Sequence, residues 1–141
     1  MGLLLSREPG LDAAAFAGLL HRSGLAARRP ADDLPRLAAM LEASQLIVTA
    51  RDGQGGGLIG VARAITDWAY CLYCADLAVD RDWQGQGIGK ALLARLVAES
   101  PGVKSHLLLS APAAVGFYEK AGCARHPAAF LFTDLGPDTR G

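Results

Sequence analysis

The spacing of hydrophobic positions changes several times along the chain, and each spacing predicts one kind of element. Short apolar runs rich in β-branched residues predict strands, whereas apolar residues three and four apart predict helices. We therefore expect strands at residues 3–7, 46–50, 58–65, 68–79, 103–109 and 129–133. We expect helices at residues 11–21, 33–43, 88–99 and 113–120.

The order of these elements predicts the fold class. One strand and two helices precede three consecutive strands with short links, which are typical of an antiparallel meander. A helix, a strand, a helix and a strand follow. We predict a mixed α+β fold, with a mostly antiparallel central sheet of six to seven strands flanked by about four helices. No repeat or linker divides the chain, so we expect a single domain at residues 1–135 and a flexible tail at residues 136–141.

Composition and charge narrow the classes of partner. The 141 residues are 51% hydrophobic, and 14 basic residues balance 14 acidic ones. A chain without net charge is not built to coat nucleic acid or to anchor on an anionic membrane. No apolar run reaches the length of a membrane span, and the first residues lack the pattern of a signal peptide. We expect a cytoplasmic protein with no nucleic-acid or membrane partner.

The cysteines do not predict a metal or redox site. Cys71 and Cys74 form a C-x-x-C, but it lies on a predicted strand, where positions three apart point to opposite faces. No second C-x-x-C completes a zinc site. Three cysteines also form no disulfide framework. We interpret Cys71 and Cys74 as small buried residues and expect no metal.

A glycine-rich turn links the fourth predicted strand to the helix that starts near Ile88. Its sequence is Gln84-Gly85-Gln86-Gly87-Ile88-Gly89. Glycines allow positive φ and let a ligand approach the backbone closely. The free N–H groups of a helix's first turn favour an anion, and Lys90 adds a positive charge. This combination predicts a phosphate-binding site.

Two common phosphate motifs do not fit this turn. The Walker A pattern needs a glycine where Gln84 stands and a serine or threonine where Ala91 stands. The dinucleotide fingerprint needs a third glycine where Lys90 stands, and no parallel βαβ unit surrounds it. A nucleotide-phosphate enzyme is therefore disfavoured.

Two segments together resemble the GNAT acetyltransferase superfamily. The turn at residues 84–89 is similar to that family's acyl-CoA signature, Q/R-x-x-G-x-G/A, and residues 76–80 are similar to the strand before it. Residues 116–123 resemble its second landmark, F-Y-x-x-x-G-F. The resemblance covers essentially the whole chain. It implies a GNAT fold and an N-acetyltransferase that uses acetyl-CoA as co-substrate and a primary amine of a small molecule or protein as acceptor. It also leaves open a homodimer.

The resemblance also implies roles for individual residues. Tyr118 matches the family's usual general acid, which protonates the departing thiolate. The edge of the fourth strand would pair with the pantetheine arm, and the glycine-rich turn would hold the pyrophosphate. The residues expected to bind the cofactor are Leu77, Ala78, Val79, Gln84, Gly85, Gln86, Gly87, Ile88, Gly89 and Lys90.

The acceptor side carries less specific signals. Asp76 is the only carboxylate within the strand that leads to the turn, so it is a candidate for binding the amine or accepting its proton, with an exposed strand-end residue as the alternative. Trp68 and Tyr73 are candidates for lining the acceptor pocket, or for core packing. Arg28 and Arg29 lie in the loop where this family admits its acceptor, and a solvated loop is the alternative.

The chain also departs from the family pattern. Ala111 stands where members often carry an asparagine that contacts the cofactor, and the adjacent Ser110 is a candidate substitute. Asp80 and Arg81 replace a pair that ends in proline, which predicts a looser turn. Cys123 replaces an aromatic residue. The alternative function, from another class, is a non-catalytic acyl-CoA sensor with the same fold.

Overall fold

The computed structural model describes residues 2–54 and 56–136. The chain separates into two compact units, Met1–Leu109 and Ser110–Gly141, and each is described by itself. The predicted tail at residues 136–141 lies outside the described residues except for Gly136. The predicted single domain stays a prediction.

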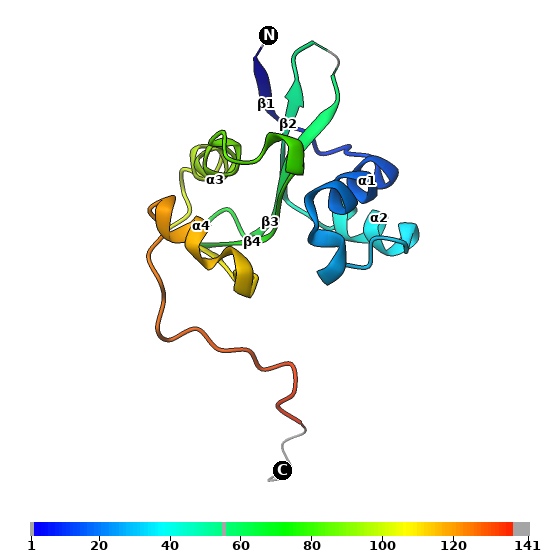
Figure 1. Cartoon of the computed structure of the whole chain (residues 1–141). Helices are drawn as coiled ribbons and strands as arrows, with labels where there is room; N and C mark the ends of the chain where they lie inside the picture. Colours follow the sequence, from blue (N-terminus) through cyan, green and yellow to red (C-terminus); the bar gives the residue numbers. More distant parts are fainter. Residues whose placement is uncertain (1, 55, 137–141) are drawn as a thin grey trace. The chain divides into compact units, whose positions relative to one another are not determined.

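The first unit is built on a five-stranded sheet whose strands follow the order of the sequence (Figure 1). The first four strands pair antiparallel as the predicted meander, and the fifth pairs parallel with the fourth. This arrangement confirms the mixed, mostly antiparallel sheet. The strands are β1 (Leu3–Arg7), β2 (Leu46–Asp52), β3 (Leu58–Thr66), β4 (Cys71–Val79) and β5 (Ser105–Leu108).

Three α-helices belong to the same unit, and local sequence explains their ends. They are α1 (Ala13–Ser23), α2 (Leu34–Glu42) and α3 (Ile88–Ala98), with short 3₁₀ turns η1 (Leu25–Arg28) and η2 (Arg81–Trp83) between elements. The Asp33 carboxylate accepts the Arg36 N–H and caps α2. Gly24 ends α1 in the left-handed region at φ 88°. None of the helices in the described residues is long and apolar enough to cross a membrane.

The sheet is packed on both faces, by different helices. Phe16, Leu20 and Leu37 from α1 and α2 pack against Val61 and Ala78 of one face. On the other face, a second cluster joins α3 to the sheet through Ile88, Leu92, Leu96, Val48, Ala62, Leu72 and Cys74. Figure 1 shows α1 and α2 on one side of the strands and α3 on the other. Alternation along each strand therefore decides which helical layer a side chain meets.

A β-bulge at Ala75 changes this alternation within β4. Arg63 of β3 pairs with Asp76, but the next residue, Ala64, pairs with Cys74, so that Ala75 is an extra residue. Before the bulge, Cys74 packs in the α3 layer. Beyond it, Ala78 packs in the α1–α2 layer, and Asp76 shares its face.

The second unit contains η3 (Pro112–Ala114) and α4 (Val115–Lys120). The predicted helix at residues 113–120 is therefore shorter than expected, because its first turn is a 3₁₀ turn. The predicted strand at residues 129–133 is wrong: the segment has no regular structure, and Phe130, Leu131 and Phe132 are exposed. β-propensity alone does not make a strand, which needs a partner and a packed face. Five strands in the described residues replace the six to seven that we expected.

The two cysteines of the C-x-x-C lie on opposite faces of β4, as predicted. Cys74 is buried, whereas Cys71 and Cys123 are exposed, so the prediction that Cys71 is buried is wrong. Cys71 is the first residue of β4, just after the β3–β4 turn, on the face that is exposed there. Within the described residues no three His, Cys, Asp or Glu side chains gather as a metal site.

These environments predict different thiol reactivities. Burial, aided by the nearby negative charge of Asp76, raises the pKa of the Cys74 thiol to about 12. We expect dithionitrobenzoate to titrate two thiols per native chain, and the third only after unfolding. Cys71→Ser serves as the control and should leave one rapid thiol. Three rapid thiols in the native protein would contradict the burial of Cys74.

Candidate functional site

The glycine-rich turn connects β4 to α3 with two residues in the left-handed region. Gly85 has φ 80° and Gly87, the N-cap of α3, has φ 81°. A Cβ at either position would meet no described atom within 4 Å. The backbone conformation, rather than lack of space, is therefore what requires glycine at these two positions.

The turn exposes the N-terminus of α3. The Ala91 N–H donates to the Gly87 carbonyl at 3.0 Å, which is the first bond of the helical ladder. The N–H groups of Ile88, Gly89 and Lys90 precede it and have no acceptor within the helix. Lys90 is exposed beside them, while Ile88 and Gly89 are buried. Free donors, the helix dipole and a lysine together can hold a phosphate group.

Hydrogen bonds hold the turn in this shape. Gln84 Nε2 donates to the Val79 carbonyl at 2.9 Å and closes the turn. The Asp80 carboxylate accepts the Asp82 N–H at 2.9 Å and Arg22 Nε at 2.8 Å. The Asp82 N–H, and after it the Arg22 guanidinium, hold the pKa of Asp80 below its usual range. Asp80 thus holds the start of the turn through two contacts, and the expectation that the pair Asp80 and Arg81 makes the turn looser stays a prediction.

The last part of β4 has a strand partner on one edge only. Ala78 pairs with Val61 of β3, and Leu77 and Val79 pair with the neighbouring residues of that strand. On the other edge, β5 pairs with β4 from Cys71 to Cys74 and no further in the described residues. From Ala75 onward this edge of β4 carries backbone groups that an extended ligand can pair with.

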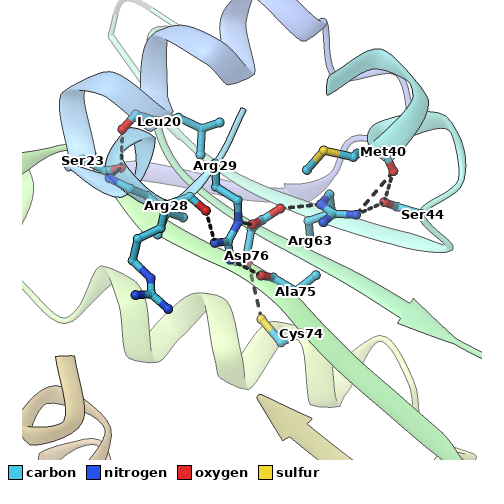
Figure 2. Close-up of polar contacts among 11 residues, drawn as sticks. Leu20, Ser23, Arg28, Arg29, Met40, Ser44, Arg63, Cys74, Ala75 and Asp76 are labelled. Atoms are coloured by element: carbon cyan, nitrogen blue, oxygen red, sulfur yellow. Dashed lines mark hydrogen bonds and ion pairs between the residues drawn. The ribbon is translucent and has the colours of Figure 1, made fainter. Parts of the chain in front are cut away.

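Asp76 lies next to this edge but is enclosed. Its side chain has no exposed surface, and its two oxygens accept from Arg29 Nε and from Arg63 Nε, each at 2.5 Å. Figure 2 shows the carboxylate between the two guanidinium groups. It is therefore not the exposed strand-end residue of the alternative interpretation. An amine has no path to this carboxylate unless an arginine moves, which argues against a role as base or amine ligand.

The three predicted acceptor residues lie at different places. Trp68 lies in the β3–β4 turn, at the opposite end of β4 from the glycine-rich turn, and its φ is 62°. The Arg7 guanidinium carbon lies over the Trp68 ring, 5.3 Å from the ring centroid. Tyr73 is exposed on the same face of β4 as Asp76. Arg28 is exposed at the end of η1, and its carbonyl accepts from Arg29. Arg29 thus brings Arg28 close to Asp76, whereas Trp68 lies away from both.

Tyr118 belongs to α4 in the second unit. Its ring is partly buried and meets the Phe117 ring edge-on, with 5.0 Å between the centroids. Its carbonyl accepts the Cys123 N–H at 3.0 Å, which closes the end of α4. Ser110, in the same unit, donates to the Ala111 carbonyl at 2.7 Å. The roles of Tyr118 and Ser110 toward a cofactor stay predictions.

Two arginines at the site were not predicted from the sequence, Arg22 and Arg63, and the pairing of Arg29 with Asp76 was not predicted either. For Arg63 a signal exists, because it interrupts the apolar run of β3 and a buried guanidinium needs a carboxylate partner. Asp76 is the only carboxylate of β4, the strand that pairs with β3 at this point. Arg22 carries no such signal, and the place of Arg29 in the loop between the first two helices does not indicate a carboxylate partner.

Comparison with known proteins agrees with this geometry. The acetyltransferase (GNAT) domain matches residues 42–122, more than half of the chain. The "Serotonin N-acetyltransferase 2, chloroplastic" of Oryza sativa subsp. japonica is 32% identical over 122 residues, which cover 84% of this chain and 59% of that protein. The "GCN5-related N-acetyltransferase 2, chloroplastic" of Arabidopsis thaliana is 31% identical over 145 residues, covering 89% of this chain and 55% of that protein.

The chain thus spans somewhat more than half the length of these curated relatives. Among solved structures, an acetyltransferase of Trypanosoma brucei superimposes with a TM-score of 0.67 at 25% identity, covering 92% of this chain and 98% of that one. The domain match includes β4, the glycine-rich turn and α3, whose first N–H groups are described above. The chain belongs to the GNAT acetyltransferase family.

Proposed function

We propose that this chain transfers an acetyl group from acetyl-CoA to a primary amine of a small molecule or protein. The observation that carries the proposal is the open N-terminus of α3 directly after a β4 edge without a strand partner. The first feature suits a pyrophosphate, and the second suits the amide groups of a pantetheine arm. Acetyl-CoA has both groups in one molecule, and family membership supports the same ligand.

The cofactor would then lie along β4, from the glycine-rich turn toward the point where β4 and β5 stop pairing. The pyrophosphate would accept from the N–H groups at residues 86–90, with Lys90 adding charge. The pantetheine arm would pair with the edge at Leu77, Ala78 and Val79. The thioester would lie near Ala75, where the ladder with β5 has ended.

The chemistry is a direct transfer. The neutral amine nitrogen attacks the thioester carbonyl, a C–N bond forms, and the C–S bond breaks. The sulfur leaves as a thiolate and takes a proton, for which Tyr118 is the proposed general acid. The proton lost by the amine passes to solvent water in this scheme and not to Asp76, because both oxygens of that carboxylate already accept from arginines.

The acceptor is proposed only as a class, a primary amine. The name of the rice relative makes serotonin one compound for an acceptor panel, beside lysine peptides and protein N-termini. A cytoplasmic location and a homodimer stay predictions. If no amine in a broad panel releases CoA while acetyl-CoA binds tightly, the non-catalytic sensor replaces the enzyme.

Ligand-dependent melting tests the cofactor. At a hundredfold excess over its dissociation constant, acetyl-CoA should stabilise the protein by about 2.7 kcal/mol. ATP has phosphates but no pantetheine arm to pair with β4, so it should raise the melting temperature far less at the same concentration. An equal shift with both ligands would sink the acetyl-CoA assignment.

Gly87→Ala tests the turn. The substitution should lower the free energy of unfolding by about 1–2 kcal/mol, because alanine is strained in the left-handed conformation of residue 87. We also expect about tenfold weaker acetyl-CoA binding in a titration, since the helix start shifts. Gly57→Ala is the matched control: it is exposed, lies outside the left-handed region and has open space for a Cβ. Equal affinities in the two variants would argue against a binding role for the turn.

Tyr118→Phe tests the proposed acid. Loss of a general acid should lower kcat by about 10²-fold or more, because the thiolate then leaves without a proton. The dissociation constant for acetyl-CoA should stay within about twofold of the native value. Thiol detection with a responsive amine measures the rate. A variant with unchanged kcat would remove Tyr118 from the chemistry but leave the cofactor assignment intact.

A further inference from the structure

The connection between α1 and α2 is fastened to the sheet at both ends. We call residues 24–29 the strap; it consists of Gly24, the turn η1 and Arg29. The backbone of the strap forms one short 3₁₀ turn, and it pairs with no strand or helix in the described residues. Its position on the sheet therefore depends on side chains.

Arg29 fastens the far end of the strap to β4. Its Nε donates to Asp76 Oδ1, and one terminal nitrogen donates to the Ala75 carbonyl at 2.8 Å. The other terminal nitrogen donates back to the Arg28 carbonyl at 2.8 Å. Ala75 is the extra residue of the bulge. The planar fork of one guanidinium thus joins strap backbone, strand backbone and a buried carboxylate.

Asp76 extends the same network to the end of α2. Its second oxygen accepts from Arg63 Nε, and an Arg63 terminal nitrogen donates to Ser44 Oγ at 3.1 Å. Ser44 Oγ in turn donates to the Met40 carbonyl in the last turn of α2. Figure 2 shows these contacts in one line from Arg28 to Ser44. The exposed fractions of the side chains are 25% for Arg29, 9% for Arg63 and 0% for Asp76.

The near end of the strap is fastened to the turn after β4. Arg22, in the last turn of α1, donates to Asp80 at 2.8 Å and to the Leu58 carbonyl at 2.7 Å. A Cβ on Gly24 would lie 2.7 Å from an Arg81 terminal nitrogen, so Arg81 packs directly against the strap. The strap therefore runs beside β4 from the start of the glycine-rich turn to the bulge.

We propose that Arg29 and Asp76 are positioning residues that hold the strap, with the exposed Arg28, beside the end of the β4–β5 ladder, where it forms one wall of the acceptor site. Asp76 acts as the anchor for Arg29 and Arg63 and not as a base. The role of the strap at an acceptor site rests on the proposed transferase function. The fastening of the strap by Arg29 does not depend on that function.

Arg29→Gln is the informative variant, because it leaves Asp76 paired with Arg63 and so leaves no buried carboxylate alone. Arg29→Lys keeps the charge but lacks the planar fork, so it should rescue only part of the effect. Arg36→Gln is the matched control: this arginine of neighbouring α2 is exposed and pairs only with Asp33 of its own helix in the described contacts.

Hydrogen exchange on the protein without cofactor tests the fastening directly. In Arg29→Gln, amides of residues 24–31 should exchange about tenfold faster or more, because charged hydrogen bonds to the strap are lost. Peptides from α3 and β2 should exchange as in the native chain, and Arg36→Gln should change neither region. Unchanged exchange in the strap, or a uniform increase over the whole chain, would overturn the inference.

Steady-state kinetics with an amine that the native chain acetylates tests the role of the strap at the acceptor site. Arg29→Gln should raise KM for the amine about tenfold, while kcat and the dissociation constant for acetyl-CoA stay within about twofold. Asp76→Asn should show the same split, with a pH profile of kcat like that of the native chain. A large fall in kcat with loss of one limb of that profile would make Asp76 a base and overturn the proposal.

The two failures are distinguishable. If the native chain acetylates no amine, the proposed function falls, while the exchange experiment still decides whether Arg29 fastens the strap. If the native chain is active and Arg29→Gln leaves KM for the amine unchanged, the transferase stands and the positioning role falls.

Discussion

One buried carboxylate organises the layer of α1 and α2. Asp76 has no exposed surface, and a charge without water must be compensated by partners. Arg63 comes from the neighbouring strand and Arg29 from the strap, so the compensation links three segments far apart in sequence. Loss of Arg29 alone leaves the carboxylate paired with Arg63, whereas loss of both arginines would leave a buried charge without compensation, which typically costs about 3–5 kcal/mol. The positions of the strap and of the end of α2 depend on this group.

The bulge at Ala75 makes that arrangement compatible with the rest of β4. Without the extra residue, Cys74 and Asp76 would lie on one face of the sheet, and Asp76 would point into the apolar α3 layer. With it, Asp76 turns toward the arginines, while Leu77 and Val79 pack on the α3 side. The bulge also lies where the pairing of β4 with β5 ends. One local irregularity therefore turns the Asp76 carboxylate toward the α1–α2 layer and comes directly before the unpaired edge of β4.

Local features of the sequence predicted most of the first unit, and non-local ones were missed. Apolar spacing and the glycines at 85 and 87 act over a few residues, so they predict α2, the meander and the turn before α3. The bulge depends on how β4 aligns with β3, and the partners of Asp76 lie 13 and 47 residues away along the chain. The strand prediction at residues 129–133 is wrong for a related reason. The residues favour a strand locally, but no strand of the described structure pairs with them.

The same arginine-rich surroundings explain why aspartate suits position 80. The carboxylate binds the Asp82 N–H and Arg22, and so couples the start of the glycine-rich turn to the end of α1. Because these contacts lower the pKa of Asp80, its contribution to stability is complete above the ordinary value of 3.8 and is lost as the pH falls through the lowered pKa. At neutral pH the start of the glycine-rich turn and the end of α1 are therefore joined through an ionised group.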